Sequence, residues 1–131
     1  MLRLWSVQQA VYAHMSGDAT LLGMVTTITD QPNQNTAFPY VTIGEGTGVP
    51  DDLLIESGGS QTLNLHIWDK STSMSGVKGI MDRMVQRLHN ASFAVASSQM
   101  VRCAVEFAEV MREGDGEIRH GIMRLRVETF G

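Results

Sequence analysis

Cysteine, basic charge and long apolar runs are all scarce in this 131-residue chain. The single cysteine, Cys103, excludes an intrachain disulfide and any zinc site built from several thiolates. Lysine and arginine number 10 against 14 acidic residues, so the net charge of -4 gives no overall basic field to attract nucleic acid or an anionic membrane. No segment approaches the roughly 20 apolar residues that span a bilayer, and no apolar N-terminal run indicates export. We therefore expect no contact with a membrane and no sequence-specific DNA binding.

The composition is otherwise that of an ordinary folded protein. Hydrophobic residues make up 43% of the chain and charged residues 18%, which is far from the composition of a disordered or fibrous protein. A chain of this length has room for one hydrophobic core, and it shows no internal repeat or linker. We expect residues 1–131 to form a single domain.

Two long segments repeat apolar residues at helical spacing. The first predicts an amphipathic helix from Leu2 to His14, and Gly17 ends it. Its stripe consists of Leu4, Val7, Val11 and Met15. The second runs to His89 and Asn90, with apolar residues Val77, Ile80, Met81, Met84, Val85 and Leu88. Between them, Asp18 can cap a short helical turn.

Four segments have the character of strands. One begins at about Tyr40, and the next alternates apolar and polar residues from Gln61 to Trp68. Alternation from Val101 to Phe107 and from Ile118 to Thr129 predicts a hairpin across the glycine-bearing turn at 113–116, and Phe93 and Val95 suggest a further brief strand. The order predicts an α+β two-layer sandwich: a mainly antiparallel sheet of about four strands with two main helices on one face.

Residues with catalytic or metal-binding chemistry are scattered. The four histidines (His14, His66, His89 and His120) lie in four separate elements, and Cys103 lies among alternating apolar residues, where a buried inert thiol is the usual outcome. The acids at 51–52 and 113–117 lie in glycine-rich turns, and the glycines at 44–48 lack the lysine and hydroxyl residue of a phosphate-binding loop. We predict no catalytic residue, no metal site and no cofactor, and hence no enzyme.

Two sets of residues are candidates for contacts with partners. Arg119, Arg124 and Arg126, with Arg102 across the hairpin, are expected to form a basic stripe on the open face of the sheet. That stripe can be a solvated face with cross-strand ion pairs, a subunit contact, or the wall of a channel along which DNA passes without being read. The second set, Leu53, Leu54 and Ile55, is an apolar triplet inside a long glycine-rich loop from Gly44 to Gly59. It can be a subunit contact or a short edge strand that folds back on its own core.

Three segments, in this order and spacing, resemble a family of small tail proteins of siphophages and prophages: Phe38-Pro39-Tyr40-Val41-Thr42-Ile43-Gly44, Leu63-Asn64-Leu65-His66-Ile67-Trp68-Asp69 and Arg119-His120-Gly121-Ile122-Met123-Arg124-Leu125-Arg126. The likeness covers nearly the whole chain. It implies a tail-completion or tail-terminator protein, a subunit of a ring, typically a hexamer, that caps the tail tube and presents a surface to the head connector. It also implies a place in the virion tail, assembly in the host cytoplasm, DNA only as the passing genome, and no catalytic residues.

Two other interpretations remain open at this stage. A connector or stopper component on the head side would share the small size and the ring assembly. A small-molecule binding module would need a pocket with converging polar groups, which the sequence does not display.

Overall fold

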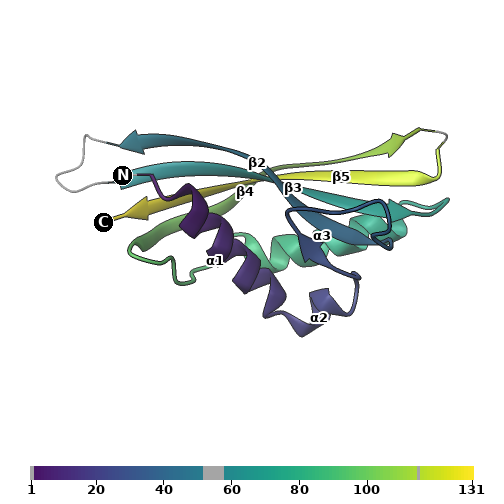
Figure 1. Ribbon diagram of the computed structural model, residues 1–131, viewed down its shortest axis with the longest axis horizontal. Coiled ribbons are helices and arrows are strands. Elements are labelled where there is room, and N and C mark those ends of the chain that lie inside the picture. The colour runs from purple at the N-terminus through teal and green to yellow at the C-terminus, as the bar shows by residue number, and fades with distance from the viewer. Residues whose placement is uncertain (1, 52–57, 115) are drawn as a thin grey trace.

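A computed structural model describes residues 2–51, 58–114 and 116–131 (Figure 1). The helices are α1 (Leu4–Ser16), α2 (Ala19–Leu22) and α3 (Ser75–Leu88). The strands are β1 (Ile28–Thr29), β2 (Tyr40–Asp51), β3 (Gly58–Lys70), β4 (Gln99–Glu113) and β5 (Ile118–Phe130). None of the helices in this described part is long and apolar enough to cross a membrane.

The five strands form one sheet in the order β1-β2-β3-β5-β4. β1 lies parallel to β2, and the other three pairs are antiparallel. The helices lie on one side of the sheet, and the other side is open (Figure 1). The predicted α+β architecture is confirmed. The sheet has five strands where about four were predicted, because β1 is only two residues long and so has no periodicity to detect.

The core forms where the inner face of the sheet meets α1 and α3. Inward side chains alternate along the central strands, and α3 covers them with residues three and four apart. The buried set includes Leu63, Leu65, Ile67, Met123, Leu125, Val127, Val77, Ile80, Met81, Met84 and Leu88. On α1, Val7, Val11 and Met15 are buried as predicted, but Leu4 is 49% exposed and Ala10 occupies the core instead. Leu4 is the first residue of the helix, and its side chain lies beside Gly48 of β2.

The prediction of one long loop from Gly44 to Gly59 is wrong over most of its length. β2 continues to Asp51 and β3 begins at Gly58, and the two strands pair from Gly46 with Leu63 to Asp51 with Gly58. A register shift between Ile43 and Gly46 marks a bulge. Glycine is unfavourable in strands, so the glycines of this segment predicted a loop. Pairing with β3 stabilises the segment as a strand.

The predicted alternation along β4 also breaks. Register shifts lie between Met100 and Arg102 and between Val105 and Phe107. Cys103 is buried as expected, whereas Phe107 is placed opposite Arg124 and is 42% exposed. Each bulge adds one residue and moves the side chains that follow it to the other face of the sheet. A prediction from strict alternation cannot locate such a shift. The brief strand expected at Phe93 and Val95 is a single bridge between Val95 and Ser98.

An ion pair fixes α2 against α3. The Asp18 carboxylate accepts hydrogen bonds from Nε and Nη2 of Arg83, both at 2.7 Å, and from the main-chain N–H of Leu21 at 3.3 Å. The hydrogen bonds from Arg83 are the main reason why the pKa of Asp18 falls from 3.8 to about 2. Asp18 therefore caps α2 as predicted and also ties it to a helix that lies 65 residues further along the chain.

This ion pair predicts a pH dependence of stability. A carboxyl whose pKa is lowered by folding stabilises the fold above its unfolded pKa, and that contribution is lost as the pH falls from about 4 to about 2. We expect Asp18→Asn to lower the urea midpoint at pH 7 and to have a much smaller effect at pH 2.5. Urea titrations of both proteins at the two pH values measure this difference. An equal loss at both pH values would show that the charge of Asp18 contributes nothing.

Candidate functional site

A chain of four titratable side chains crosses the open face of the sheet, with one residue from each long strand. His66 Nε2 lies 2.9 Å from Glu45 Oε1, His66 Nδ1 lies 2.8 Å from His120 Nε2, and His120 Nδ1 lies 2.8 Å from Glu113 Oε1. Asn64 donates a further hydrogen bond to Glu45 at 2.8 Å. These contacts tie β2, β3, β5 and β4 together along a diagonal of the sheet.

The contacts of Glu45 set its charge. The hydrogen bonds from His66 and Asn64 lower the pKa of Glu45 from 4.5 to about 2, so this carboxyl is ionised at neutral pH.

Aromatic rings stack beside the two histidines. The His120 ring stacks on Trp68 with 3.8 Å between the ring centroids and 10° between the planes. Tyr40 lies beyond Trp68, with 6.5 Å between their centroids. His120 is only 7% exposed although it lies on the open face, because its neighbours on the sheet cover it. Such stacking holds the ring in one orientation.

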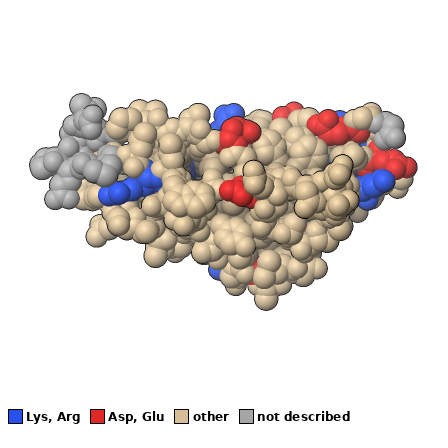
Figure 2. Space-filling view, viewed as in Figure 1, with Lys and Arg blue, Asp and Glu red and all other residues tan. Residues whose placement is uncertain are grey.

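Three of the four predicted arginines lie on the open face: Arg124, Arg126 and Arg102, which pairs with Glu128. Arg124 lies over the ring of Phe107, with 5.5 Å from Cζ to the centroid. Arg126 lies between two acids, with its Nη1 3.8 Å from Glu106 and its Nε 3.3 Å from Glu128. Figure 2 shows, from one side of the molecule, basic and acidic residues interspersed on a mostly uncharged surface, without a continuous basic area.

Arg119 does not belong to that stripe, so its predicted place on the open face is wrong. It has the same parity along β5 as the buried residues Gly121 and Met123, and it is 3% exposed. Its guanidinium donates hydrogen bonds to the carbonyl oxygens of Gly116 and Thr72, the latter at 3.1 Å. Arg119 therefore ties Gly116 to the segment before α3. The other predicted set, Leu53, Leu54 and Ile55, lies outside the described residues.

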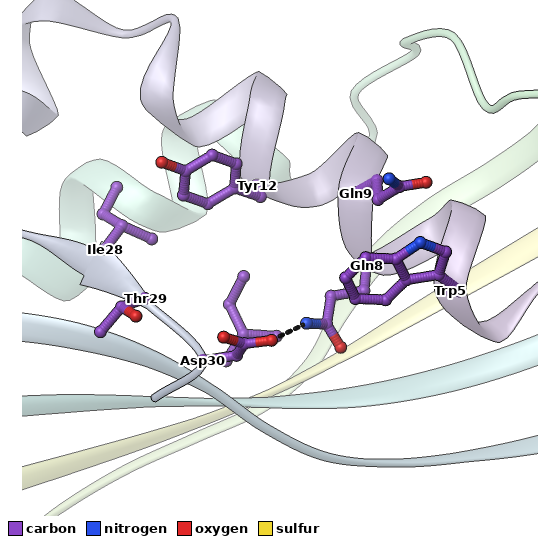
Figure 3. Close-up of a pocket in the computed structure, with 8 residues that line it drawn as sticks. Trp5, Gln8, Gln9, Tyr12, Ile28, Thr29 and Asp30 are labelled. Atoms are coloured by element: carbon purple, nitrogen blue, oxygen red, sulfur yellow. Dashed lines mark hydrogen bonds between the residues drawn. The ribbon is translucent and has the colours of Figure 1, made fainter. Parts of the chain in front are cut away.

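A groove that sequence reasoning missed runs between α1 and the β1 edge of the sheet (Figure 3). Its volume is about 530 Å³, and it is lined by Trp5, Gln8, Gln9, Tyr12, Ile28, Thr29, Asp30 and Ile43. Trp5 and Tyr12 are 61% and 46% exposed. Gln8 donates a hydrogen bond to Asp30 across the groove at 2.9 Å. Exposed aromatic rings one turn or two apart on a helix mark a contact surface rather than a core face.

Cys103 and the two paired histidines carry the nucleophilic and metal-binding chemistry of the described residues. Burial raises the pKa of the Cys103 thiol to about 12, so its nucleophilic thiolate form is negligible at neutral pH. Within the described residues, His66 and His120 have no serine, threonine or cysteine among their hydrogen-bond partners. The same part of the chain contains no cluster of three or more histidine, cysteine or acidic residues that could hold a metal ion. The histidine chain joins the strands of the open face by hydrogen bonds.

The sequence model of one family, described as tail completion protein gp17, matches residues 9–129. The chain belongs to this family. It is 25% identical over 121 residues to tail completion protein gp17 of Bacillus phage SPP1, across 92% of this chain and 90% of that protein. The tail-protein resemblance of the three sequence segments is confirmed, and the role of the chain is a structural one in a phage tail.

Solved structures show the same fold as this tail completion family member. A chain in the virion of a native gene transfer agent particle superposes with a TM-score of 0.87 at 20% identity, across 95% of both chains. The structure of bacteriophage SPP1 gp17 superposes with a TM-score of 0.67 at 23% identity, across 93% of this chain and 87% of that chain.

The features that sequence reasoning missed arise from pairing across strands. The histidine chain joins residues 54 positions apart, and the groove joins α1 to a two-residue strand. One signal was available for the histidines. The alternation along the sequence puts His66 and Trp68 on the polar face of their strand. It also puts His120 on the face of its strand opposite to the apolar residues Gly121 and Met123. Only the register that puts Trp68 opposite His120 brings the rings together.

Proposed function

We propose that this chain is a subunit of a closed hexameric ring that caps the completed tail tube and joins the tail to the head connector or stopper. The observation that carries the proposal is the family match over residues 9–129, supported by the full-length likeness to a chain of a gene transfer agent virion. A ring of identical subunits repeats one heterologous contact by rotation, so its function resides in surfaces. The protein acts without catalysis or cofactor and assembles in the bacterial cytoplasm.

The charges on the open face fit a protein past which DNA moves. Arg126 lies between two glutamates, and Arg124 keeps its charge above the Phe107 ring. Single positive charges interspersed with acids bind phosphates less tightly than a continuous basic area, which suits a wall along which a genome slides. DNA is then a passing cargo and not a ligand that the protein reads.

Electron microscopy tests the proposal. The purified protein is imaged alone and after mixing with tubes of the tail tube protein of the same phage. We expect rings at tube ends, with a central hole at least as wide as duplex DNA. Binding to head connectors with no binding to tubes would favour a head-side stopper instead. A protein that binds neither tubes nor connectors would contradict both interpretations.

The apolar triplet Leu53, Leu54 and Ile55 is proposed as a subunit contact. Changing Leu53 and Leu54 together to Asp places two charges in that contact, and we expect loss of ring assembly while the monomer stays folded. Sedimentation velocity measures assembly and circular dichroism measures folding. The control is Leu22→Asp, because Leu22 is an exposed leucine of α2 and should tolerate the same change. An unfolded double variant would show that the triplet packs on its own core.

A further inference from the structure

The sheet has two lateral edges with unpaired main-chain groups. In the described part of the chain, β1 pairs with β2 only at Val41 and Thr42, so β2 from Gly44 to Asp51 has a partner on one side only. At the opposite edge, β4 pairs only with β5. Asn90 and His89 cover the middle of β4, with hydrogen bonds to Cys103 and from Val105. No strand of the described residues pairs with the outer side of Phe107–Glu113.

Exposed apolar side chains flank the same two edges. Trp5 and Tyr12 line the groove beside the β1–β2 edge, and Val49 on β2 is 65% exposed. On β4, Val101 is 62% exposed and Phe107 42%. An open strand edge with apolar neighbours is a site for pairing with another chain, unless charge or a covering segment protects it.

The directions of the strands make the two edges complementary. β2, β3, β5 and β4 follow one another as antiparallel neighbours, so β4 runs opposite to β2. A second copy, related to the first by a rotation about the ring axis, therefore has its β4 antiparallel to the free segment of β2 in the first copy. Antiparallel pairing between one edge and the other edge of the next copy is a heterologous contact, which closes into a ring.

Charge on the helix side of the sheet fits the same arrangement. Arg112 lies opposite Arg119, so it shares the helix-side face of the sheet with the groove, and it is exposed. Asp30 is exposed at the rim of the groove, next to Thr29, which pairs with Thr42. Directly opposed side chains share a face, so the matching antiparallel register places Phe107 opposite Val49 on the open face and Val110 opposite Gly46 on the helix side. This register carries Arg112 towards the end of the groove where Asp30 lies. This register also offsets the copies along the strands, and strands that are tilted and staggered are the geometry of a closed sheet.

We propose that β4 of one copy adds to the free β2 edge of the next copy, with Arg112 against Asp30 beside the Trp5–Tyr12 groove. The partner at this surface is a second copy of the chain. The inference rests on the proposed ring and specifies its subunit contact.

Cross-linking tests the contact in protein bound to tail tubes, between copies that each carry one introduced cysteine. One population carries Val49→Cys and the other Phe107→Cys, and a short bis-maleimide links cysteines that are close, while the native Cys103 is buried. We expect mixed-pair cross-links in a mixture and almost none with either variant alone. Rings at tube ends without the mixed cross-link would overturn the edge contact and leave the ring intact. Failure to bind tubes at all would overturn the ring and this contact together.

A charge exchange provides the second test. Asp30→Arg and Arg112→Asp each place like charges at the contact, and we expect each to weaken ring assembly at least about tenfold, as sedimentation velocity measures. The double variant should recover most of the assembly. Leu22→Lys is the matched control and should assemble like the wild type. Two single losses without recovery in the folded double variant would contradict the pairing of these residues.

Discussion

Replacing Leu65 by Ala should lower the free energy of unfolding by about 2–5 kcal/mol. Leu65 is fully buried at the middle of β3, paired with Ile43 on one side and Met123 on the other. Strands hold it on both sides and helices cover it, so the surroundings cannot collapse to fill the space. The urea midpoint should fall while the slope of the transition stays constant, because the same surface becomes exposed on unfolding.

The exposed Leu22 gives the control for this prediction. Leu22→Ala removes the same atoms from a side chain that is 46% exposed on α2, and we expect a change of less than about 0.5 kcal/mol. The difference between the two variants measures burial and not helix or strand propensity. Equal losses in the two variants would mean that the core does not form around β3 as described.

The parts of the fold that could be predicted are those where burial follows a fixed period. β3 alternates from Gly59 to Asp69 because α1 and α3 cover one face of it. α3 repeats apolar residues at three and four positions because one side of it faces the sheet. The second half of β2 could not be predicted in this way. Its glycines and Pro50 favour a turn locally, and only pairing with β3 makes that segment a strand.

The candidate site was less predictable than the fold because it depends on register. Arg124 and Arg126 were placed on the open face by parity, which β5 preserves, but the same parity puts Arg119 on the buried face. Arg119 and Arg124 lie an odd number of residues apart, so a regular strand cannot place both on the open face. On β4 the reverse occurs, because two bulges shift the register within one strand and bring Phe107 to Arg124.

Replacing His120 by Ala should lower the free energy of unfolding by about 2–4 kcal/mol. The change removes the ring stacked on Trp68 and the contacts to His66 and Glu113, both at 2.8 Å. Each of the four long strands contributes to this chain of hydrogen bonds, so its loss loosens the open face across the whole sheet. Urea unfolding measures the loss.

His120→Phe separates the two contributions. A phenyl ring can keep the stacking on Trp68 but cannot bond to His66 or Glu113, so we expect a loss about 1 kcal/mol smaller than for His120→Ala. Glu113 is 40% exposed and can be hydrated when its partner is gone, whereas His66 is 17% exposed and recovers less. If the Phe variant is as unstable as the Ala variant, the hydrogen bonds alone stabilise this face. If neither variant differs from the wild type, the histidine chain contributes nothing to stability, and its conformation is set by the strands around it.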